Sequence, residues 1–308
     1  MISEIRKLVL AWLLVCALAA VGCRGTETET SQNIKSDPKD TPVIVITDEQ
    51  PEYLTGQTKD PIEEQTDAVT EDVEAAENSD ETGSTEPSEP KQAEDRGYIA
   101  IDAGHQIRGN NGKEPLGPGS AEMKAKVSGG TSGVETGIPE YELNLQVALK
   151  LRDELESRGY RVLMIREDNE VDISNSERAQ MANEAGVDAL IRIHANGSEN
   201  RSVSGAMTIC QTPKNPYNGN LYRESRALSE KVLDAFTAST GARKEKIWET
   251  DSMTGINWCQ TPVTIIEMGY MSNPDEDRLM ATEEYRMKMA VGIADGIDAY
   301  MDMKTKED

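Results

Sequence analysis

The sequence predicts an α/β fold, a single domain with a mostly parallel central sheet flanked by helices on both faces. Two observations support this prediction. From about residue 96 onward, short apolar runs typical of buried strands alternate with longer segments whose apolar residues recur at helical spacing. Such alternation is typical of parallel sheets covered on both sides. The residues before 96 are acidic and poor in aromatic side chains, so the 308-residue chain has room for one domain of ordinary size.

The predicted strands are short runs rich in Ile, Val, Leu and Ala, bounded by glycine or polar residues. They cover residues 98–102, 160–165, 188–193, 205–210 and 262–266. Between the first strand and the first helix, residues 106–138 are rich in Gly, Pro and Ser and show little periodicity. We therefore expect a long loop there, and such a loop in a compact domain tends to be functional.

The predicted helices follow from apolar spacing and from residues typical of helix ends. Leucines four residues apart predict a helix that ends near Ser157, just before Gly159. Ser174 and Glu177 have the spacing of a capping box, which opens a helix that runs to about Ala185. Further helices are expected at about 221–239, 275–281 and 283–302, and a polar tail at 304–308.

The N-terminus has the features of an export signal. Arg6 and Lys7 precede an apolar stretch over residues 8–21, which is too short to span a bilayer comfortably. Small residues lead up to Cys23, as in a bacterial lipoprotein signal, so we expect residues 1–22 to be removed and Cys23 to carry lipid. Two alternatives stay open, an ordinary secretory signal with a coincidental cysteine and an uncleaved anchor.

Residues 23–95 are predicted to be an acidic, disordered linker. From Arg24 to Asp95 there are 21 acidic and 5 basic residues, a net charge of −16, while the whole chain carries −24. Such a segment buries too little apolar surface to offset the entropy of folding. The acidity also argues against nucleic acid as a partner, because there is no basic stripe to contact phosphates.

Besides Cys23, two cysteines would remain in the mature chain, Cys210 and Cys259. An extracellular setting permits a disulfide between them, and two buried thiols are the alternative. Their spacing is not that of metal ligands, and the sequence leaves the choice open.

Three residues suited to chemistry follow predicted strands. His105 and His194, the two histidines of the chain, come after the strands at 98–102 and 188–193, and Glu267 comes directly after the strand at 262–266. The carboxyl ends of parallel strands meet at one edge of a sheet, where ligands gather. Zinc accepts imidazole nitrogen and carboxylate oxygen, so one shared metal site is plausible at this edge.

Five motifs then occur in order over residues 97–302: Ile101-Asp-Ala-Gly-His105, Glu140-Tyr-Glu-Leu-Asn-Leu145, Ser176-Glu-Arg178 with Ala182-Asn183, Ile193-His-Ala-Asn196, and Ile266-Glu-Met-Gly-Tyr-Met-Ser-Asn273. Each motif alone is weak. Together they resemble the zinc-dependent N-acetylmuramoyl-L-alanine amidases of the third amidase type, and the resemblance covers the whole folded part. It implies a zinc amidase catalytic domain at 96–303.

The resemblance implies that His105, Glu140 and His194 bind one zinc ion and that Glu267 is the catalytic carboxylate. Glu142 competes with Glu140, but Glu140 stands in the family's register, at the start of the helix and four residues before the Asn-Leu pair. The implied reaction is metal-assisted hydrolysis of the amide between the lactyl group of N-acetylmuramic acid and L-alanine of the stem peptide. Glu267 would act as the general base.

Other polar residues of the motifs are expected to support the fold. We expect Arg178 and Asn183 to bond helix to sheet, Asp102 to brace the turn at the first histidine, and Asn196 to shape the turn after the second. Arg192 is a departure from the family pattern, because a small Ser is common at this place.

The implied partners are peptidoglycan as substrate and the membrane through a lipid on Cys23, with the protein acting as an extracytoplasmic monomer, either anchored or secreted. Two other functions remain open. One is a different zinc-dependent wall hydrolase, a peptidase or a deacetylase, which would share the metal set. The other is a non-catalytic wall-binding lipoprotein, which predicts a lost ligand or base, whereas all four positions hold competent residues.

Overall fold

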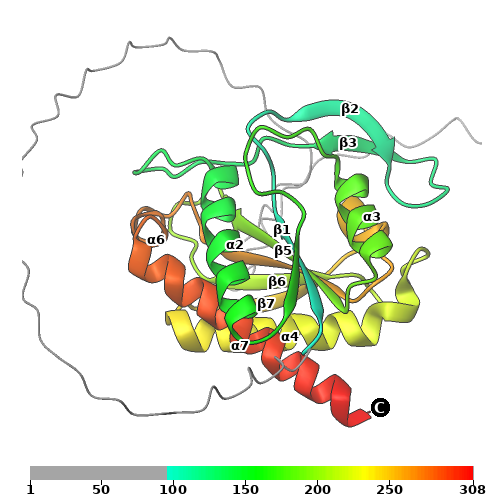
Figure 1. The fold of residues 1–308 in the computed structure, drawn as a ribbon. Coiled ribbons are helices and arrows are strands. Elements are labelled where there is room, and N and C mark those ends of the chain that lie inside the picture. Colours follow the sequence, from blue (N-terminus) through cyan, green and yellow to red (C-terminus); the bar gives the residue numbers. More distant parts are fainter. Residues whose placement is uncertain (1–95, 308) are drawn as a thin grey trace, which may run out of the picture. The chain divides into compact units, whose positions relative to one another are not determined.

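The computed structural model describes residues 96–307, and the predictions made for residues 1–95 lie outside this part. Six strands form the central sheet in the order β4-β1-β5-β8-β6-β7 (Figure 1). Their bounds, in chain order, are β1 Tyr98–Ala103, β4 Arg161–Met164, β5 Ala189–Asn196, β6 Ala206–Cys210, β7 Lys244–Glu249 and β8 Val263–Tyr270. The predicted α/β fold with a mostly parallel sheet is confirmed.

The sheet has one antiparallel contact. β1 pairs in parallel with β4 and β5, and β5 pairs in parallel with β8. β6 runs antiparallel to β8 and parallel to β7, so β6 and β7 form an edge of opposite direction. The alternation of predicted strands and helices in the sequence did not predict that β6 and β7 run in the opposite direction.

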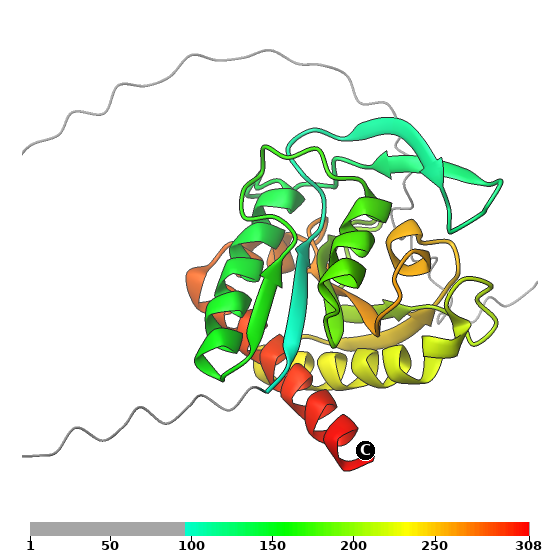
Figure 2. The ribbon, with the colours of Figure 1, turned by 45° about the vertical axis from the view of Figure 1, so that its right-hand side comes forward.

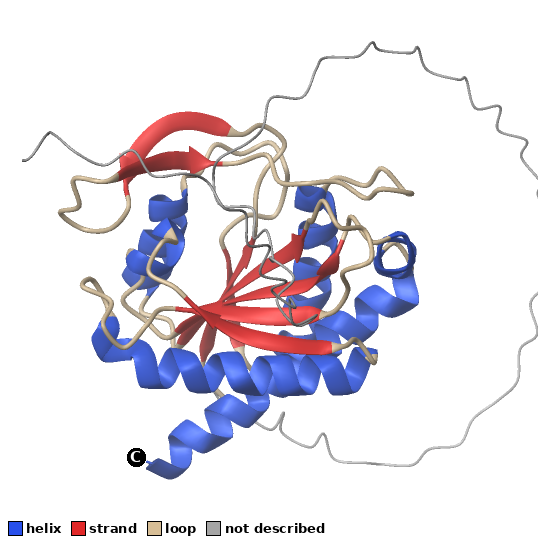
Figure 3. Ribbon diagram, turned by 180° about the vertical axis from the view of Figure 1, so that it is seen from behind, coloured by secondary structure: helices blue, strands red, loops and turns tan. Residues whose placement is uncertain are grey.

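Helices cover both faces of the sheet, each over its own apolar cluster. One cluster joins the sheet to α2 (Glu140–Ser157), α4 (Tyr222–Thr240) and α7 (Glu283–Glu307). The other joins the opposite face to α3 (Asn175–Ala185) and the short α5 (Thr254–Asn257). Figure 3 shows the strands between these two groups of helices. Side chains alternate along each strand, so Ile191 and Ile193 enter the first cluster and Leu190 the second.

Local sequence signals explain where several helices begin and end. Ser174 accepts a hydrogen bond from the backbone of Glu177, whose side chain accepts one in return, so the predicted capping box is present at the start of α3. Asn273 caps α6 (Pro274–Met280), with proline at the first helical position. A one-turn 3-10 helix, η1 (Gly219–Leu221), leads into α4.

Several predicted elements need correction. The loop expected at 106–138 contains an antiparallel hairpin of β2 (Asn110–Pro115) and β3 (Met123–Val127), which projects beyond the strand ends in Figure 2. β7 and α5 were not predicted. The final helix passes its predicted end at residue 302 and reaches Glu307, so the polar residues 304–307 continue the helix.

Two further findings bear on the sequence analysis. Cys210 and Cys259 are both buried free thiols, and burial raises the pKa of each to about 11, which makes them poor nucleophiles. Among residues 96–307, no helix is long and apolar enough to cross a membrane.

Candidate metal centre

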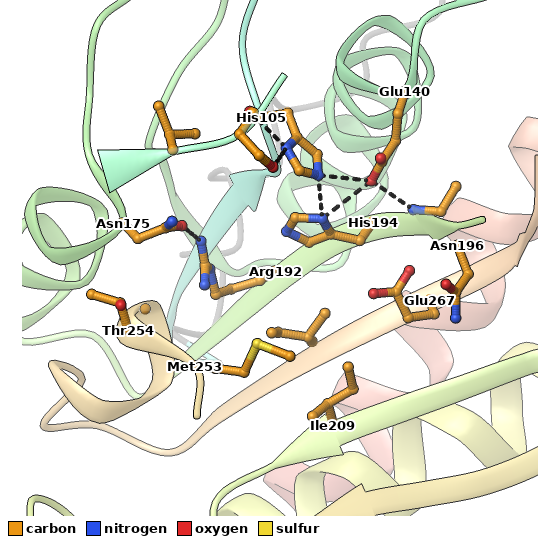
Figure 4. Close-up of a pocket in the computed structure, with 15 residues that line it drawn as sticks. His105, Glu140, Asn175, Arg192, His194, Asn196, Ile209, Met253, Thr254 and Glu267 are labelled. Carbon is orange, nitrogen blue, oxygen red and sulfur yellow. Dashed lines mark hydrogen bonds and ion pairs between the residues drawn. The ribbon is translucent and has the colours of Figure 1, made fainter. Parts of the chain in front are cut away.

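The two histidines and one glutamate meet at the carboxyl edge of the sheet. β1 connects through α2 to β4 on one side, whereas β5 lies on the other side of β1, so the strand order reverses between β1 and β5. Such a reversal opens a crevice at the strand ends. His105 follows β1, His194 lies near the end of β5, and Glu140 is the first residue of α2. Their ligand atoms all lie within 4.8 Å of one another (Figure 4).

The three side chains converge on one point. Glu140 Oε1 lies 3.1 Å from His105 Nε2 and 3.2 Å from His194 Nδ1, and the two imidazole nitrogens are 3.1 Å apart. The rings stand nearly perpendicular, with an interplanar angle of 81°. His105 Nε2, His194 Nδ1 and Glu140 Oε1 therefore face one common point, as the ligands of a single metal ion do.

The backbone around His105 fixes its ring. His105 Nδ1 lies 2.9 Å from the Ser128 carbonyl oxygen, which can only accept, so Nδ1 carries the proton and Nε2 presents a lone pair. The residue has φ 62°, a left-handed conformation unusual for histidine. Arg178 donates to the carbonyl oxygens of Ala103 and His105 and so holds this bend.

Gly104 is required by the closeness of the two histidines. A Cβ atom at this position would lie 2.2 Å from Cε1 of His194 and 2.3 Å from its Nε2. No side chain fits, because the other imidazole occupies that space. The glycine of the Ala-Gly-His sequence is therefore required by packing against His194.

Glu140 is held by donors on both carboxylate oxygens. Oε1 accepts from the Ala195 backbone at 3.1 Å and from Asn144 Nδ2 at 3.3 Å, and Oε2 accepts from the Thr131 backbone at 3.0 Å. Its place in the first turn of α2 also favours negative charge. Glu142 lies apart and accepts from Gln146 and Asn169. Glu140, and not Glu142, is the carboxylate of this cluster.

The pKa values in the cluster reflect burial and mutual contact. Burial alone would raise the pKa of Glu140, but the two imidazoles hold it well below its usual value. Burial lowers the pKa of His194 to about 4. For His105, burial is opposed by the Glu140 carboxylate, and the pKa lies above its usual value. The cluster is thus an ionised carboxylate beside two imidazoles, one of which favours the neutral form that binds metals.

The donor set suits a zinc ion. Neutral imidazole and carboxylate are typical zinc ligands, and three protein ligands leave a position for water or substrate. The His105 ring already donates its second nitrogen to a carbonyl oxygen, the arrangement that orients metal-bound histidines. His194 Nε2 is buried and finds no hydrogen-bond partner within the described domain, so Nδ1 is the nitrogen that the cluster engages.

Glu267 lies next to the cluster on the neighbouring strand. It is directly opposite His194 in the β5–β8 register and lines the same pocket. Its side chain is buried, and no residue from 96 to 307 hydrogen-bonds Oε2. Burial, and then the charge of Glu140, raises the pKa of Glu267 to about 8. A divalent cation at the cluster would favour its ionised form.

Most of the remaining predicted residues make supporting contacts. Asp102 lies outside the cluster and pairs with Arg178 at 2.6 Å and Arg192 at 2.8 Å. The side chain of Asn196 accepts from the next backbone amide. Asn183 of α3 donates to the carbonyl oxygen of Trp258 at the end of α5 and accepts from the amide of Gln260, so it bonds α3 to the end of another helix and not to the sheet as predicted. Glu267 and His194 lie within their strands rather than after them, because β5 and β8 extend beyond the predicted apolar runs.

Some supporting groups were missed in the sequence. The carbonyl of Ser128 and the amides of Thr131 and Ala195 act through backbone atoms, which leave no residue-type signal. Asn144 was noted only as part of a motif, and its spacing of four residues from Glu140 on a helix was the available signal.

Comparison with known proteins places this site in a family. The profile described as N-acetylmuramoyl-L-alanine amidase (Amidase_3) matches residues 99–299, a range that includes all four predicted site residues. An uncharacterized protein of Bacillus subtilis is 30% identical over 190 residues, 61% of this chain and 88% of its own. An N-acetylmuramoyl-L-alanine amidase of Mycobacterium tuberculosis is 26% identical over 209 residues, 66% of this chain and 86% of its own.

The fold is also similar to that of solved structures. The crystal structure of the N-acetylmuramyl-L-alanine amidase Ami1 from Mycobacterium smegmatis has a TM-score of 0.62 and 27% sequence identity. The match covers 68% of this chain and 98% of that one. The similarity therefore extends over nearly the whole of that crystal structure.

Proposed function

Because the chain belongs to the Amidase_3 family of N-acetylmuramoyl-L-alanine amidases, we propose that its peptidoglycan amidase activity depends on one zinc ion held by His105, Glu140 and His194. The observation that carries this proposal is the convergence of two imidazole nitrogens and one carboxylate oxygen within 4.8 Å. The bond cut joins the lactyl group of N-acetylmuramic acid to L-alanine of the stem peptide.

Each ligand is prepared by its surroundings. Ser128 keeps the His105 proton on Nδ1, so Nε2 is free to bind. The backbone amides on Glu140 favour its ionised form and fix its orientation. A zinc ion held there would supply Lewis-acid activation of water and polarisation of the scissile carbonyl.

Glu267 is the proposed general base. Its side chain has one carboxylate oxygen without a partner in the described domain, lies opposite His194 in the strand register, and lines the same pocket. In its ionised form it takes a proton from the attacking water and then delivers that proton to the leaving amine. Its neighbour Met207 on β6 offers no competing hydrogen-bond donor.

We propose further that the protein acts outside the cytoplasm as a monomer. The export signal at 1–22 would be removed, a lipid on Cys23 would anchor the chain to the membrane, and the acidic linker at 23–95 would connect this anchor to the amidase domain. The monomer is supported by the fact that one chain supplies all four site residues.

Product analysis tests the reaction. The full chain, purified in detergent and supplied with zinc, is expected to release stem peptides with free L-alanine amino groups from peptidoglycan, and a chelator should abolish the release. Glu267→Gln should lower the rate by at least ~10²-fold, as is typical for loss of a general base. Free muramic lactyl ends without cut cross-links support the amidase, whereas cut cross-links or loss of acetyl groups would identify another hydrolase.

A matched pair of variants tests the ligand set. Glu140→Gln should lower zinc content, measured by elemental analysis of the purified protein, together with activity. Glu142→Gln removes an equal charge from the same helix turn but outside the cluster, and it should keep both. Equal zinc content in the wild type and Glu140→Gln would contradict the assignment, as would full zinc content without any wall hydrolysis.

A further inference from the structure

Arg192 places a guanidinium inside the catalytic pocket. It stands two residues before His194 on β5, so both side chains lie on the same face of the sheet, and both line the pocket (Figure 4). Its residue exposure is only 3%. Nε donates to Asp102 Oδ2 at 2.8 Å, and Nη2 donates to Asn175 Oδ1 at 2.7 Å. The side chain is therefore fixed in one orientation.

This corner of the pocket has more positive than negative charge. Among the described ion pairs, Arg178 and Arg192 share a single acidic partner, Asp102. One carboxylate cannot neutralise two guanidiniums, and Arg178 is fully enclosed by its bonds to Asp102 and neighbouring carbonyls. The surplus charge therefore reaches the pocket through Arg192, where an anionic ligand would be favoured.

Three hydrogen-bond donors around this corner have no acceptor among residues 96–307. No hydrogen bond within residues 96–307 involves Nη1 of Arg192. Thr254 is 2% exposed, and its Oγ1 is buried without a partner. The Asn175 side chain uses its oxygen to accept from Arg192, which leaves its amide nitrogen available to donate. All three residues line the pocket that also contains Glu267.

Gly255 permits this arrangement. A Cβ atom there would lie 1.9 Å from Nη1 of Arg192 and 2.4 Å from its Cζ. Any side chain would displace the guanidinium, so the backbone of α5 can approach Arg192 only at a glycine. The close approach brings the hydroxyl of Thr254, the preceding residue, to the same corner.

We propose that Arg192, Asn175 and Thr254 form a subsite that binds a carboxylate of the stem peptide close to the scissile amide. This inference rests on the proposed amidase function and names a group of the substrate, a stem-peptide carboxylate, that the enzyme would recognise. A planar guanidinium with two flanking neutral donors suits a carboxylate, which only accepts hydrogen bonds. A carboxamide would instead point its own NH2 donor at the donors of the subsite.

The position along the strand indicates which carboxylate is bound. Two residues of a β-strand span about 6.6 Å, and two residues of an extended peptide span about 7 Å. A ligand with its scissile carbonyl near His194 therefore places the carboxylate of the residue after L-alanine near Arg192. In a stem peptide this group is a free acid or its amide, so the subsite would distinguish the two forms.

Two matched substrates test the proposal. They are muramoyl dipeptides that differ only in the second residue, whose carboxylate is free in one and amidated in the other. The wild type should cleave the free acid with a kcat/KM about tenfold or more higher, mainly through KM. Equal rates on both substrates would overturn the subsite while leaving the amidase function standing. Cleavage of neither, together with intact peptidoglycan, would instead refute the proposed function.

Three variants probe the subsite with different risks to folding. Thr254→Val removes a hydroxyl that has no partner, so the fold should be kept. Asn175→Asp adds a carboxylate beside Arg192 at a helix N-terminus, where it is tolerated, and should repel the free acid. Arg192→Met leaves Asp102 paired with Arg178. Each should reduce the preference for the free acid, and Arg226→Met on α4, across the sheet, should not.

Binding of the product peptide gives a readout separate from catalysis. Calorimetry with the dipeptide of L-alanine and the second residue should show tighter binding of the free acid than of the amide, and Asn175→Asp should remove the difference. If Arg192 instead pairs with the lactyl carboxylate of the sugar product, the variants would relieve inhibition by that product and leave the preference between peptides unchanged. That outcome would overturn the assignment to the stem peptide.

Discussion

Asp102 is a buried carboxylate whose ionisation is set by two arginines. Burial alone would raise its pKa, but the charges and hydrogen bonds of Arg178 and Arg192 hold the pKa far below the usual 3.8. Both guanidiniums depend on this one partner for charge compensation. The residue therefore connects the turn before His105 with α3 and with β5.

Stability should depend on Asp102 in acid. Its pKa is lower in the folded than in the unfolded chain, so its contribution is complete above about pH 5 and is lost progressively as the pH falls below that. Asp102→Asn should lower the free energy of unfolding near pH 7 by about 3–5 kcal/mol, because two buried guanidiniums lose their charge partner. Urea unfolding measured from pH 3 to pH 7 checks both expectations.

The control for this experiment is Asp153→Asn, which alters an exposed carboxylate paired with its neighbour Arg152. It should leave the unfolding curve nearly unchanged. A loss of stability for Asp102→Asn no larger than that of Asp153→Asn would contradict the role given to the buried carboxylate.

The residues that could be predicted from the sequence are those whose side-chain type is suited to metal binding or proton transfer. Two histidines and a glutamate placed after predicted strands indicated the pocket, and Glu140 was added by the resemblance to the amidase family. Thr254 and Asn175 gave no such signal, because hydroxyl and amide residues are common in loops and become informative only when a buried partner is missing. Arg192 was noticed only as a departure from a family pattern.

At the scale of elements, the β2–β3 hairpin is attached to α3 by a buried carboxylate. Glu114 of β2 is buried and accepts from the backbone amide of Ser176 at 3.2 Å and from its hydroxyl at 2.5 Å. Val127, at the end of β3, lines the pocket that contains His105, Glu140 and His194, together with Ser128. The attachment of the hairpin therefore also positions one wall of the site.

Glu114→Gln should loosen the hairpin. The substitution removes the charge from a hydrogen bond of a kind that contributes about 1.5–3 kcal/mol. We expect faster hydrogen exchange at the amides of β2 and β3 and little change in the central strands β1 and β5. Glu122→Gln alters an exposed carboxylate in the same hairpin and should have no such effect. Equal exchange rates in the two variants would show that the attachment is not made by Glu114.

The strands missed by sequence reasoning are short and mostly polar. β2 has one lysine and no apolar residue apart from Pro115, β3 alternates three apolar residues with two lysines over only five positions, and β7 is a partly exposed edge strand with four charged residues among six. Strands of this kind form because a partner strand is available, which is a tertiary effect. The reversed direction of β6 is likewise fixed by its neighbours and not by its own composition.

For the whole chain, the proposed anchor is testable without any structure. Cys23→Ala should move the protein from the membrane fraction to the soluble fraction or the medium, because the acyl chains would have no attachment site. Cys16→Ala, in the apolar stretch of the same signal, is the matched control and should leave the protein in the membrane fraction. Immunoblots of fractionated cells measure both, and retention of Cys23→Ala on the membrane would favour an uncleaved anchor.

The pairing of His194 with Glu267 across β5 and β8 also has a consequence for folding fidelity. A slip of one residue between these strands would turn Glu267 toward the opposite face, into the apolar layer under α4 and α7. Burying an unpaired carboxylate there costs several kcal/mol, so the misregistered sheet is penalised at once. The polar residues proposed for the reaction thus also disfavour a misaligned sheet, and a chain that has lost them would lose this penalty against wrong register.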